Sequence, residues 1–494
     1  MNEKQVAIGE STCSGVFGAV PLGAPNGTAM FSVDELSRVA MERASTAREA
    51  VEIMGSLAEK HGFYGAGQFE CTAESLGVTD PHEAWIFHVL PDPTGTSAIW
   101  AAQRIPDDGF AVLANMFVIR HVDPDDRDNF LMSDSVHSVA REYGWWDPDK
   151  GDGLLDFTKV YSDGEYSHKY YSGRRVWGGY HLAAPYVPLK EDYADLQSDP
   201  VYPVYVRIRP DSKVSAADLF RFHRYTYGGT KYDLGAVGNL AGGPFGSPDR
   251  WKAGPAEAAV GGNWERPIGL YRTSDTYVVQ SSKTSALGGT LWFGPASALA
   301  TVFTPFVVGM DVPASFRSGH HAVFSRESAF WAACFVHNVA NLKWSYAVMD
   351  IEQRQSELEE ASLRMVHEAE RRFRRDSNFT AVEEAFSGNA AKIGASLWSL
   401  SDEIVFKYAS GFVNEPEKPD GMSQMVGYPE WWLKAVGYQE GPPAPPTKPR
   451  CCHPPKPTAT EDNDESRSAT SPTMLTGKAA MRHHLRLNAS SAYS

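Results

Sequence analysis

Apolar and polar residues alternate in short blocks along residues 83–123. Three apolar runs, at residues 85–90, 97–102 and 110–114, are rich in Val, Ile, Phe, Trp and Ala. The segments between them, DPTG and PDDG, supply the Pro, Asp and Gly that favour tight turns. This pattern predicts consecutive antiparallel strands joined by hairpins. Asn115 directly follows the third run, a position that suits an ordinary turn amide.

A helical period precedes these strands. Ser32 with Glu35, and Thr46 with Glu49, match the capping box that begins a helix. Apolar residues then recur on one helical face until Gly62, which is a typical stop. These residues are Ala47, Ala50, Val51, Met54, Leu57 and Ala58. The pattern predicts two helices, the second of which packs this face against a core.

The second half of the chain changes from strands to helices. Further strands are predicted at residues 6–8, 201–208, 277–280 and 289–293. Residues 329–352 are apolar nearly all round, which predicts a buried helix. The next segment has one apolar face and a charged opposite face, which predicts an amphipathic helix. Its apolar face consists of Leu358, Ala361, Met365, Ala369 and Phe373.

Composition restricts the class of protein. The 494 residues are 42% hydrophobic and 12% aromatic, values of a packed globular chain. The net charge is −15 and the body has no Lys- or Arg-rich block, so no nucleic-acid partner is expected. No apolar run is long enough for a membrane span. Residues 438–494 are rich in Pro, Ser and charge, which predicts a disordered tail after a folded domain over residues 1–437.

The cysteines and acidic clusters give weak chemical signals. The five cysteines are odd in number and widely spaced, which argues against a disulfide scaffold or a thiolate zinc site. The acidic stretches DPDDRDN and DPDKGDG do not keep the spacing of a calcium loop, and we expect no metal or other cofactor. Residues 9–13, GESTC, lack the final Gly of a serine nucleophile elbow. Cys13 is either a thiol nucleophile that needs a base nearby or a small buried residue.

Six segments occur in one order that resembles a known family. They are NEKQVAIGESTC, EAWIFHVL with AQRIPDDGFAVLANMFVIRHVD, GGPFGSPDRW, ERPIGLYRTSDTYVVQ, LWFGPASALATVFTPFVVG and NVANLKWSYAVMDIEQRQSELE. Together they resemble the dipeptidase A and secernin family of cysteine peptidases, relatives of the penicillin V acylases and bile salt hydrolases. The resemblance runs from Asn2 to about Gly437.

The resemblance implies an α+β N-terminal-nucleophile fold, in which two antiparallel sheets lie face to face and helices flank them. It also implies a cysteine at the mature N-terminus as nucleophile, with its own α-amino group as general base. An α-amine has an ordinary pKa near 8, so it can accept the thiol proton close to neutrality. The implied substrate is a dipeptide or another small amide.

The resemblance assigns site residues by position. Asn115 matches the family asparagine whose amide donates to the oxyanion. Ser11 and Thr12 lie in the segment that lines the other side of that site and are expected to contact substrate. Arg250 is similar to the active-site arginine of the acylase relatives, with Arg272 as a competitor.

One departure from the family pattern affects the predicted activity. The family nucleophile precedes the NEK-plus-strand motif, whereas Met1 stands directly before that motif here. We therefore expect an N-terminally truncated fold without its nucleophilic cysteine, arising from a misassigned start or a lost exon. The alternatives are a catalytically inactive, secernin-like binding protein and an amidase acting on N-acyl compounds. The sequence is compatible with a homo-oligomer and does not indicate a compartment, because any signal peptide would lie upstream of Met1.

Overall fold

The computed structural model describes residues 1–66, 72–189, 203–415 and 423–441. The chain forms two compact units, Met1–Trp432 and Leu433–Ser494. The first unit contains both main sheets and the candidate site. The boundary expected at residue 437 stays a prediction, and the expected disordered tail lies outside the described residues from position 442 onward.

The first sheet is organised around the strands that the alternating blocks predicted. Its order is β1 (Ala7–Cys13), β2 (Ala73–Thr79), β3 (Ala84–Pro91), β4 (Ala98–Ile105) and β7 (Phe130–Met132). All neighbours are antiparallel. The β3–β4 hairpin is confirmed, and the Asp92 side chain accepts backbone N–H bonds from Thr96 and Ser97 in its DPTG turn.

The third predicted strand is much shorter than expected. Only β5 (Gly109–Phe110) is a strand, and it pairs with β9 (Val206–Arg207) rather than with β4. The backbone groups that follow bond to side chains instead of to a neighbouring strand. The Ala114 carbonyl accepts from Arg175, and the backbone N–H groups of Val118 and Ile119 donate to His88. Residues 111–119 therefore form a loop held by side chains, which we call the side-chain-anchored loop or Asn115 loop.

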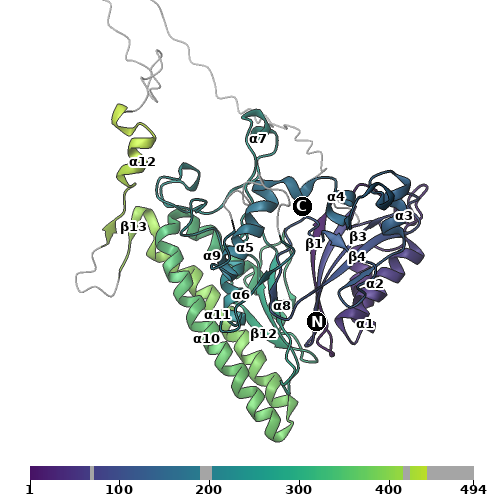
Figure 1. Cartoon of the computed structure of the whole chain (residues 1–494). Helices are drawn as coiled ribbons and strands as arrows, with labels where there is room; N and C mark the ends of the chain where they lie inside the picture. The colour runs from purple at the N-terminus through teal and green to yellow at the C-terminus, as the bar shows by residue number, and fades with distance from the viewer. Residues whose placement is uncertain (67–71, 190–202, 416–422, 442–494) are drawn as a thin grey trace, which may run out of the picture. The chain divides into compact units, whose positions relative to one another are not determined.

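Helices α1 (Val33–Arg43) and α2 (Ala47–His61) lie against the first sheet, as Figure 1 shows. Both predicted N-cap residues are confirmed: the side chains of Ser32 and Thr46 accept from the third helical N–H, and Gly62 ends α2 at a φ of 75°. The glutamates of the predicted capping boxes bind elsewhere, since Glu35 accepts from Arg38 and Glu49 accepts from the Ser45 N–H. Their apolar faces bury a core with Trp85, Phe87 and Val89 of β3 and with β4.

The second sheet carries the long helices of the chain. Its order is β10 (Asp275–Gln280), β11 (Thr290–Pro295) and β12 (Thr304–Val307), all antiparallel. Helices α10 (Trp344–Asp376) and α11 (Phe379–Lys407) pack along each other, with α9 (Ala329–Ala340) against α11 (Figure 1). A buried ion pair joins α10 to the rest of the unit: Glu359 accepts from Arg224 at 2.5 Å and from the Phe303 N–H at 2.9 Å.

The predicted helix over residues 329–352 was wrong as one continuous element. It breaks at the 3₁₀ turn η6 (Asn341–Lys343), because Lys343 adopts a φ of −149° and directs its buried ammonium to the Tyr408 carbonyl at 2.8 Å. The predicted amphipathic helix that contains Leu358 and Phe373 is confirmed as the later part of α10. Helix α11 was not predicted.

The remaining elements are short. They are β6 (His121–Val122), β8 (Leu155–Asp156), β13 (Phe412–Val413), β14 (Gln424–Met425), α3 (Ser135–Glu142), α4 (Phe157–Tyr161), α5 (Arg174–Ala183), α6 (Ala216–His223), α7 (Pro255–Ala259), α8 (Ala314–Arg317) and α12 (Glu430–Ala435). The α+β class with antiparallel sheets and flanking helices is confirmed. Within the described ranges, no helix has the length and apolar character needed to cross a bilayer.

Candidate active site

Asn115 lies within the side-chain-anchored loop and contacts the edge strand β1. Its backbone N–H donates to the Ser11 hydroxyl at 2.7 Å, and its side-chain Nδ2 donates to the Thr12 carbonyl at 2.7 Å. Its φ of 53° lies in the left-handed region, which Asn tolerates better than most residues. One amide N–H is used at Thr12, which leaves the second directed elsewhere.

Arg175 fixes the orientation of this amide. Its Nη1 and Nη2 both donate to Asn115 Oδ1 at 3.0 Å, and Nη2 also donates to the Ala114 carbonyl at 3.2 Å. Because the guanidinium only donates, the atom it contacts is the amide oxygen, and the NH₂ group faces β1. Burial, followed by repulsion from Arg266, lowers the pKa of Arg175 to about 9.

Arg175 is the second residue of α5, which directly follows an unusual helical turn. Residues Lys169–Gly173 (η3) form a π-helix that runs directly into α5. Single π turns inside helices occur often at functional sites. Within this turn the Ser172 hydroxyl lies 3.4 Å from the Asn115 carbonyl, and the Tyr171 carbonyl accepts from Arg175 Nε at 2.5 Å. The π turn therefore contacts both the backbone and the side-chain partner of Asn115.

A buried polar chain across three strands holds the loop in place. Ser75 on β2 donates to the Met116 carbonyl at 3.2 Å and lies 2.7 Å from His88 Nδ1 on β3. His88 Nε2 accepts from the N–H groups of Val118 and Ile119 at 2.9 and 3.1 Å. The Cys13 thiol on β1 lies 3.1 Å from the Ser75 hydroxyl. The residues on both sides of Asn115 are thus bound to the sheet.

This Cys–Ser–His arrangement is not a catalytic triad. Burial lowers the pKa of His88 to about 3, so the ring is neutral. Its Nε2 lone pair accepts two backbone N–H bonds, so Nδ1 carries the proton and donates toward Ser75. His88 therefore has no lone pair with which to take a proton from Ser75 or Cys13. Burial also raises the pKa of Cys13 well above its ordinary value. The hydrogen-bonded chain of Cys13, Ser75 and His88 is therefore a structural network.

Glu165 is an acidic residue whose side chain contacts the segment directly after β1. Its Oε2 accepts the Ser14 N–H at 2.6 Å, one residue beyond β1. Burial raises its pKa to about 7, and Arg175 opposes that rise only weakly. Glu165 is therefore a carboxyl group that changes charge near neutral pH, beside the strand that holds Asn115.

The structure brings three of the four predicted site residues together. Ser11, Thr12 and Asn115 are in direct contact, although Thr12 contributes its carbonyl while its hydroxyl donates to Glu10 at 2.6 Å. Arg250 does not join them. Its guanidinium donates to the carbonyls of Ser247, Asp249 and Leu234. Its competitor Arg272 stacks on Trp264. All four assignments stay predictions.

Arg175 and Glu165 were missed by the sequence reasoning. Arg175 is 60 positions from Asn115, so no local spacing links them. The available signal was the Arg–Arg pair in SGRRVWGG, a stretch otherwise dominated by Gly and aromatic residues. Two adjacent arginines in such a segment need buried partners, which is a reason to examine them.

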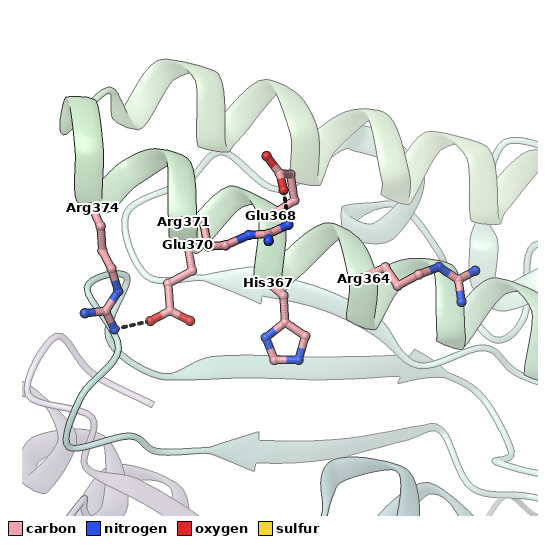
Figure 2. Close-up of a pocket in the computed structure, with 6 residues that line it drawn as sticks. All are labelled: Arg364, His367, Glu368, Glu370, Arg371 and Arg374. Atoms are coloured by element: carbon pink, nitrogen blue, oxygen red, sulfur yellow. Dashed lines mark hydrogen bonds and ion pairs between the residues drawn. The ribbon is translucent and has the colours of Figure 1, made fainter.

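Other hollows and clusters in the described ranges offer less chemistry. An open hollow of about 580 Å³ lies along α10, where Figure 2 shows Glu368 paired with Arg371 and Glu370 with Arg374. These i,i+3 and i,i+4 pairs are those of a solvated helix face. Within the described residues, no group of three or more His, Cys, Asp or Glu side chains is arranged to hold a metal ion.

Comparison with known proteins gives consistent relatives. The chain is 27% identical over 281 residues to a probable dipeptidase of Salmonella dublin, covering 56% of this chain and 55% of that protein. It is 26% identical over 272 residues to a probable dipeptidase of Latilactobacillus sakei, covering 53% and 47%. It is 23% identical over 387 residues to a probable dipeptidase A of Streptococcus pyogenes serotype M1, covering 75% and 71%. The chain thus spans about half the length of the first two relatives.

A family model extends this likeness over most of the chain. The model described as peptidase family C69 matches residues 1–357, a stretch that includes both sheets, Asn115, Arg175 and the start of α10. The matched stretch is well over half of the 494 residues. The family suggested by the ordered motifs is therefore confirmed, and this chain belongs to peptidase family C69.

Proposed function

We propose that this protein acts as a cysteine-type dipeptidase, hydrolysing the amide bond of dipeptides with Asn115 as an oxyanion donor. The observation that carries the proposal is the fixed amide of Asn115, held by the Thr12 carbonyl on one side and by Arg175 on the other. Membership of a peptidase family and the dipeptidase names of the relatives support the reaction class.

The chemistry needs a donor that is already oriented when charge develops. Attack on an amide carbonyl places a negative charge on its oxygen, and a pre-positioned N–H stabilises that charge without reorganising. The second N–H of Asn115 is suited to this role because Arg175 and Thr12 prevent the amide from turning. In the proposed reaction, Ser11 holds the Asn115 backbone and Thr12 holds its side chain.

The nucleophile is proposed to come from outside the described residues. The described free cysteines are Cys13 and Cys334. Burial raises the pKa of Cys13 well above its ordinary value and that of Cys334 to about 11, so neither is an activated thiolate. The family resemblance instead assigns attack to a cysteine with a free α-amino group, which would take up the thiol proton itself.

A hydrolysis assay tests the proposal. The purified 494-residue chain is incubated with a dipeptide panel, and released amino acids are measured with and without a thiol-blocking reagent. Thiol-sensitive release is expected from the protein expressed with the coding segment upstream of Met1, which would supply the nucleophile, and not from the 494-residue chain without that segment. Asn115→Asp should slow it by roughly a hundredfold or more. The matched variant Asn378→Asp should not slow it, because the Asn378 side chain uses only its oxygen, to cap α11. Hydrolysis that is insensitive to both treatments would contradict the proposal.

A binding function is the second candidate, favoured by the inert state of the two described thiols. A non-catalytic, secernin-like protein would bind peptides at the Asn115 site without releasing amino acids. The same assay separates the two: dipeptide binding without any hydrolysis by the protein that includes the upstream segment supports this second candidate. An amidase acting on N-acyl compounds is distinguished by including N-acyl amino acids in the panel.

A further inference from the structure

Two guanidinium groups share one aromatic ring beside Asn115. The Cζ atoms of Arg175 and Arg266 lie 4.9 and 5.2 Å from the centroid of the Tyr171 ring. Arg266 also donates from Nη1 to the Tyr171 hydroxyl at 2.7 Å. Arg175 is buried and bound to Asn115, whereas Arg266 is only half-buried and has further N–H groups to offer.

Neither arginine is neutralised by a carboxylate within the described part of the chain. Arg175 donates to the carbonyls of Tyr171 and Ala114 and to the Asn115 amide oxygen. The acid next to Arg266 in sequence, Glu265, is bound by Arg174 at 2.6 Å. A buried or half-buried charge without a counter-charge is costly, so such groups are usually paired or meet a ligand.

The local charge is positive although the chain as a whole carries −15. Repulsion from Arg266 contributes to the lowered pKa of Arg175, which places the two cations within electrostatic reach of each other. Glu165 is the acid whose charge reaches Arg175, and its pKa of about 7 leaves it only partly ionised at neutral pH. The surplus positive charge lies next to the proposed oxyanion donor, where an anionic group of the substrate would be attracted.

We propose that Arg266, supported by Arg175 and Tyr171, binds the free C-terminal carboxylate of the substrate. This inference rests on the proposed function and names its substrate class: compounds with a carboxylate one residue beyond the scissile carbonyl. One residue of extended chain spans about 3.5 Å. Arg175 donates to Asn115 and shares the Tyr171 ring with Arg266, so the proposed oxyanion donor and the guanidinium of Arg266 belong to one contiguous group of contacts.

The arrangement would select peptide length. In a dipeptide, the oxyanion at Asn115 and the carboxylate at Arg266 are engaged together. In a tripeptide cleaved at its first bond, the carboxylate is one residue farther away, and an uncharged amide takes its place. Guanidinium groups bind carboxylates through charge-assisted hydrogen bonds, which such an amide cannot replace. N-acyl amino acids keep the carboxylate and should also bind.

The test compares a carboxylate with its amide. The full chain is titrated with L-alanyl-L-leucine, L-alanyl-L-leucinamide and N-acetyl-L-leucine, measuring Kd by calorimetry, or KM for any compound that is hydrolysed. The two carboxylates should bind at least about tenfold more tightly than the amide, the loss typical of one charged hydrogen bond. Arg266→Met should remove the preference, and Arg266→Lys should keep part of it.

Arg209→Met is the matched control. Arg209 is exposed and stacks on Tyr186 at 4.0 Å, so the variant removes a similar cation–ring contact elsewhere and should leave the preference unchanged. Equal binding of acid and amide by the unaltered chain, or a preference that survives Arg266→Met, would overturn the inference. If Arg266→Met does not fold, the acid–amide comparison on the unaltered chain and on Arg266→Lys decides.

The outcomes separate this inference from the proposed function. A carboxylate preference in binding, together with no hydrolysis of any compound by the protein expressed with the coding segment upstream of Met1, would refute the dipeptidase and retain the carboxylate site. Hydrolysis with no difference between acid and amide would retain the dipeptidase and refute the carboxylate site.

Discussion

Asn115 combines a left-handed backbone with a fully oriented side chain. At a φ of 53° most residues are strained, and Asn and Asp are among those that tolerate it. The Oδ1 atom receives two bonds from Arg175, while Nδ2 donates to Thr12. The position therefore requires an acceptor and a donor on one short side chain. A substitution that keeps the left-handed backbone but removes the amide N–H can therefore test the two properties separately.

Asn115→Asp removes the amide N–H groups of the side chain. The substitution keeps the left-handed tolerance and the contact to Arg175 but replaces the NH₂ group by an oxygen that faces the Thr12 carbonyl. We expect kcat to fall by roughly a hundredfold or more, the usual loss for one oxyanion donor, while the fold stays intact by circular dichroism. A kcat within a few-fold of the unaltered protein would contradict the oxyanion role.

Glu165 provides a prediction about pH. Its folded pKa of about 7 lies above its ordinary value of 4.5, and burial is the main cause. Between these values the folded protein retains a proton that the unfolded chain has released, so the contribution of Glu165 to stability falls as pH rises through this window. Glu165→Gln removes the titration. The variant should therefore gain stability relative to the unaltered protein from pH 4.5 to 8.

Urea unfolding at pH 4.5, 6 and 8 measures this effect. One unit of pKa shift corresponds to about 1.4 kcal/mol, so the relative gain should reach the order of 1 to 3 kcal/mol by pH 8 after allowance for partial exposure. Glu357→Gln, at an exposed position of α10, serves as the control and should give a curve parallel to the unaltered protein. Parallel curves for Glu165→Gln as well would refute the raised pKa.

At the scale of elements, helix glycines show how packing overrides local propensity. A Cβ atom on Gly55 of α2 would lie 2.3 Å from the Trp100 ring of β4, and Glu59 holds that ring through a 2.6 Å bond to Nε1. Gly→Ala in a helix normally gains about 1 kcal/mol, but forced overpacking costs about 1–3 kcal/mol. Gly55→Ala should therefore lower the melting temperature.

Gly388→Ala in α11 is the matched comparison. No atom lies within 4 Å of a Cβ built there, so only the propensity gain applies. This variant should raise stability by about 0.5–1 kcal/mol, measured by the same thermal melts. An equal rise in stability for both variants would show that α2 does not pack on β4 as closely as the structure has it.

The elements also show what a sequence can reveal. The caps of α1 and α2 and the stop at Gly62 are local signals, and the structure has them where the sequence predicted. The same holds for the β3–β4 hairpin, whose turn residues and apolar runs lie within one short stretch. In each case the residues that decide the structure are neighbours along the chain, so spacing alone identifies them.

Long-range partners could not be predicted in this way. The short β5 and the break at Lys343 depend on side chains such as His88 and on a carbonyl at Tyr408, far away in sequence. Arg175 reaches Asn115 across 60 positions, and the family likeness directed attention to Arg250 instead. The sequence predicts the part of the site where β1 and the Asn115 loop carry family motifs. It does not predict Arg175, which reaches Asn115 only in the folded chain.

At the scale of the whole molecule, the thiol of Cys13 reports on the integrity of the first sheet and its core. Cys13 is fully buried in the core that also contains Ala114, Met116 and Phe117. The polar chain from Ser75 to His88 ties this core to the Asn115 loop. Access to the thiol therefore requires opening of the sheet rather than movement of one side chain.

Alkylation with iodoacetamide at pH 8, followed by peptide mass mapping, tests this description. Both burial and the raised pKa reduce the thiolate of Cys13, so its labelling in the native protein should be at least about a hundredfold slower than in urea, as expected for a thiol exposed only by global opening. Cys334, only half-buried on α9, should label faster than Cys13. Its rate controls for reagent activity. Rapid native labelling of Cys13 that a dipeptide suppresses would instead make Cys13 an accessible nucleophile, and the structural role of the Cys13–Ser75–His88 chain would have to be abandoned.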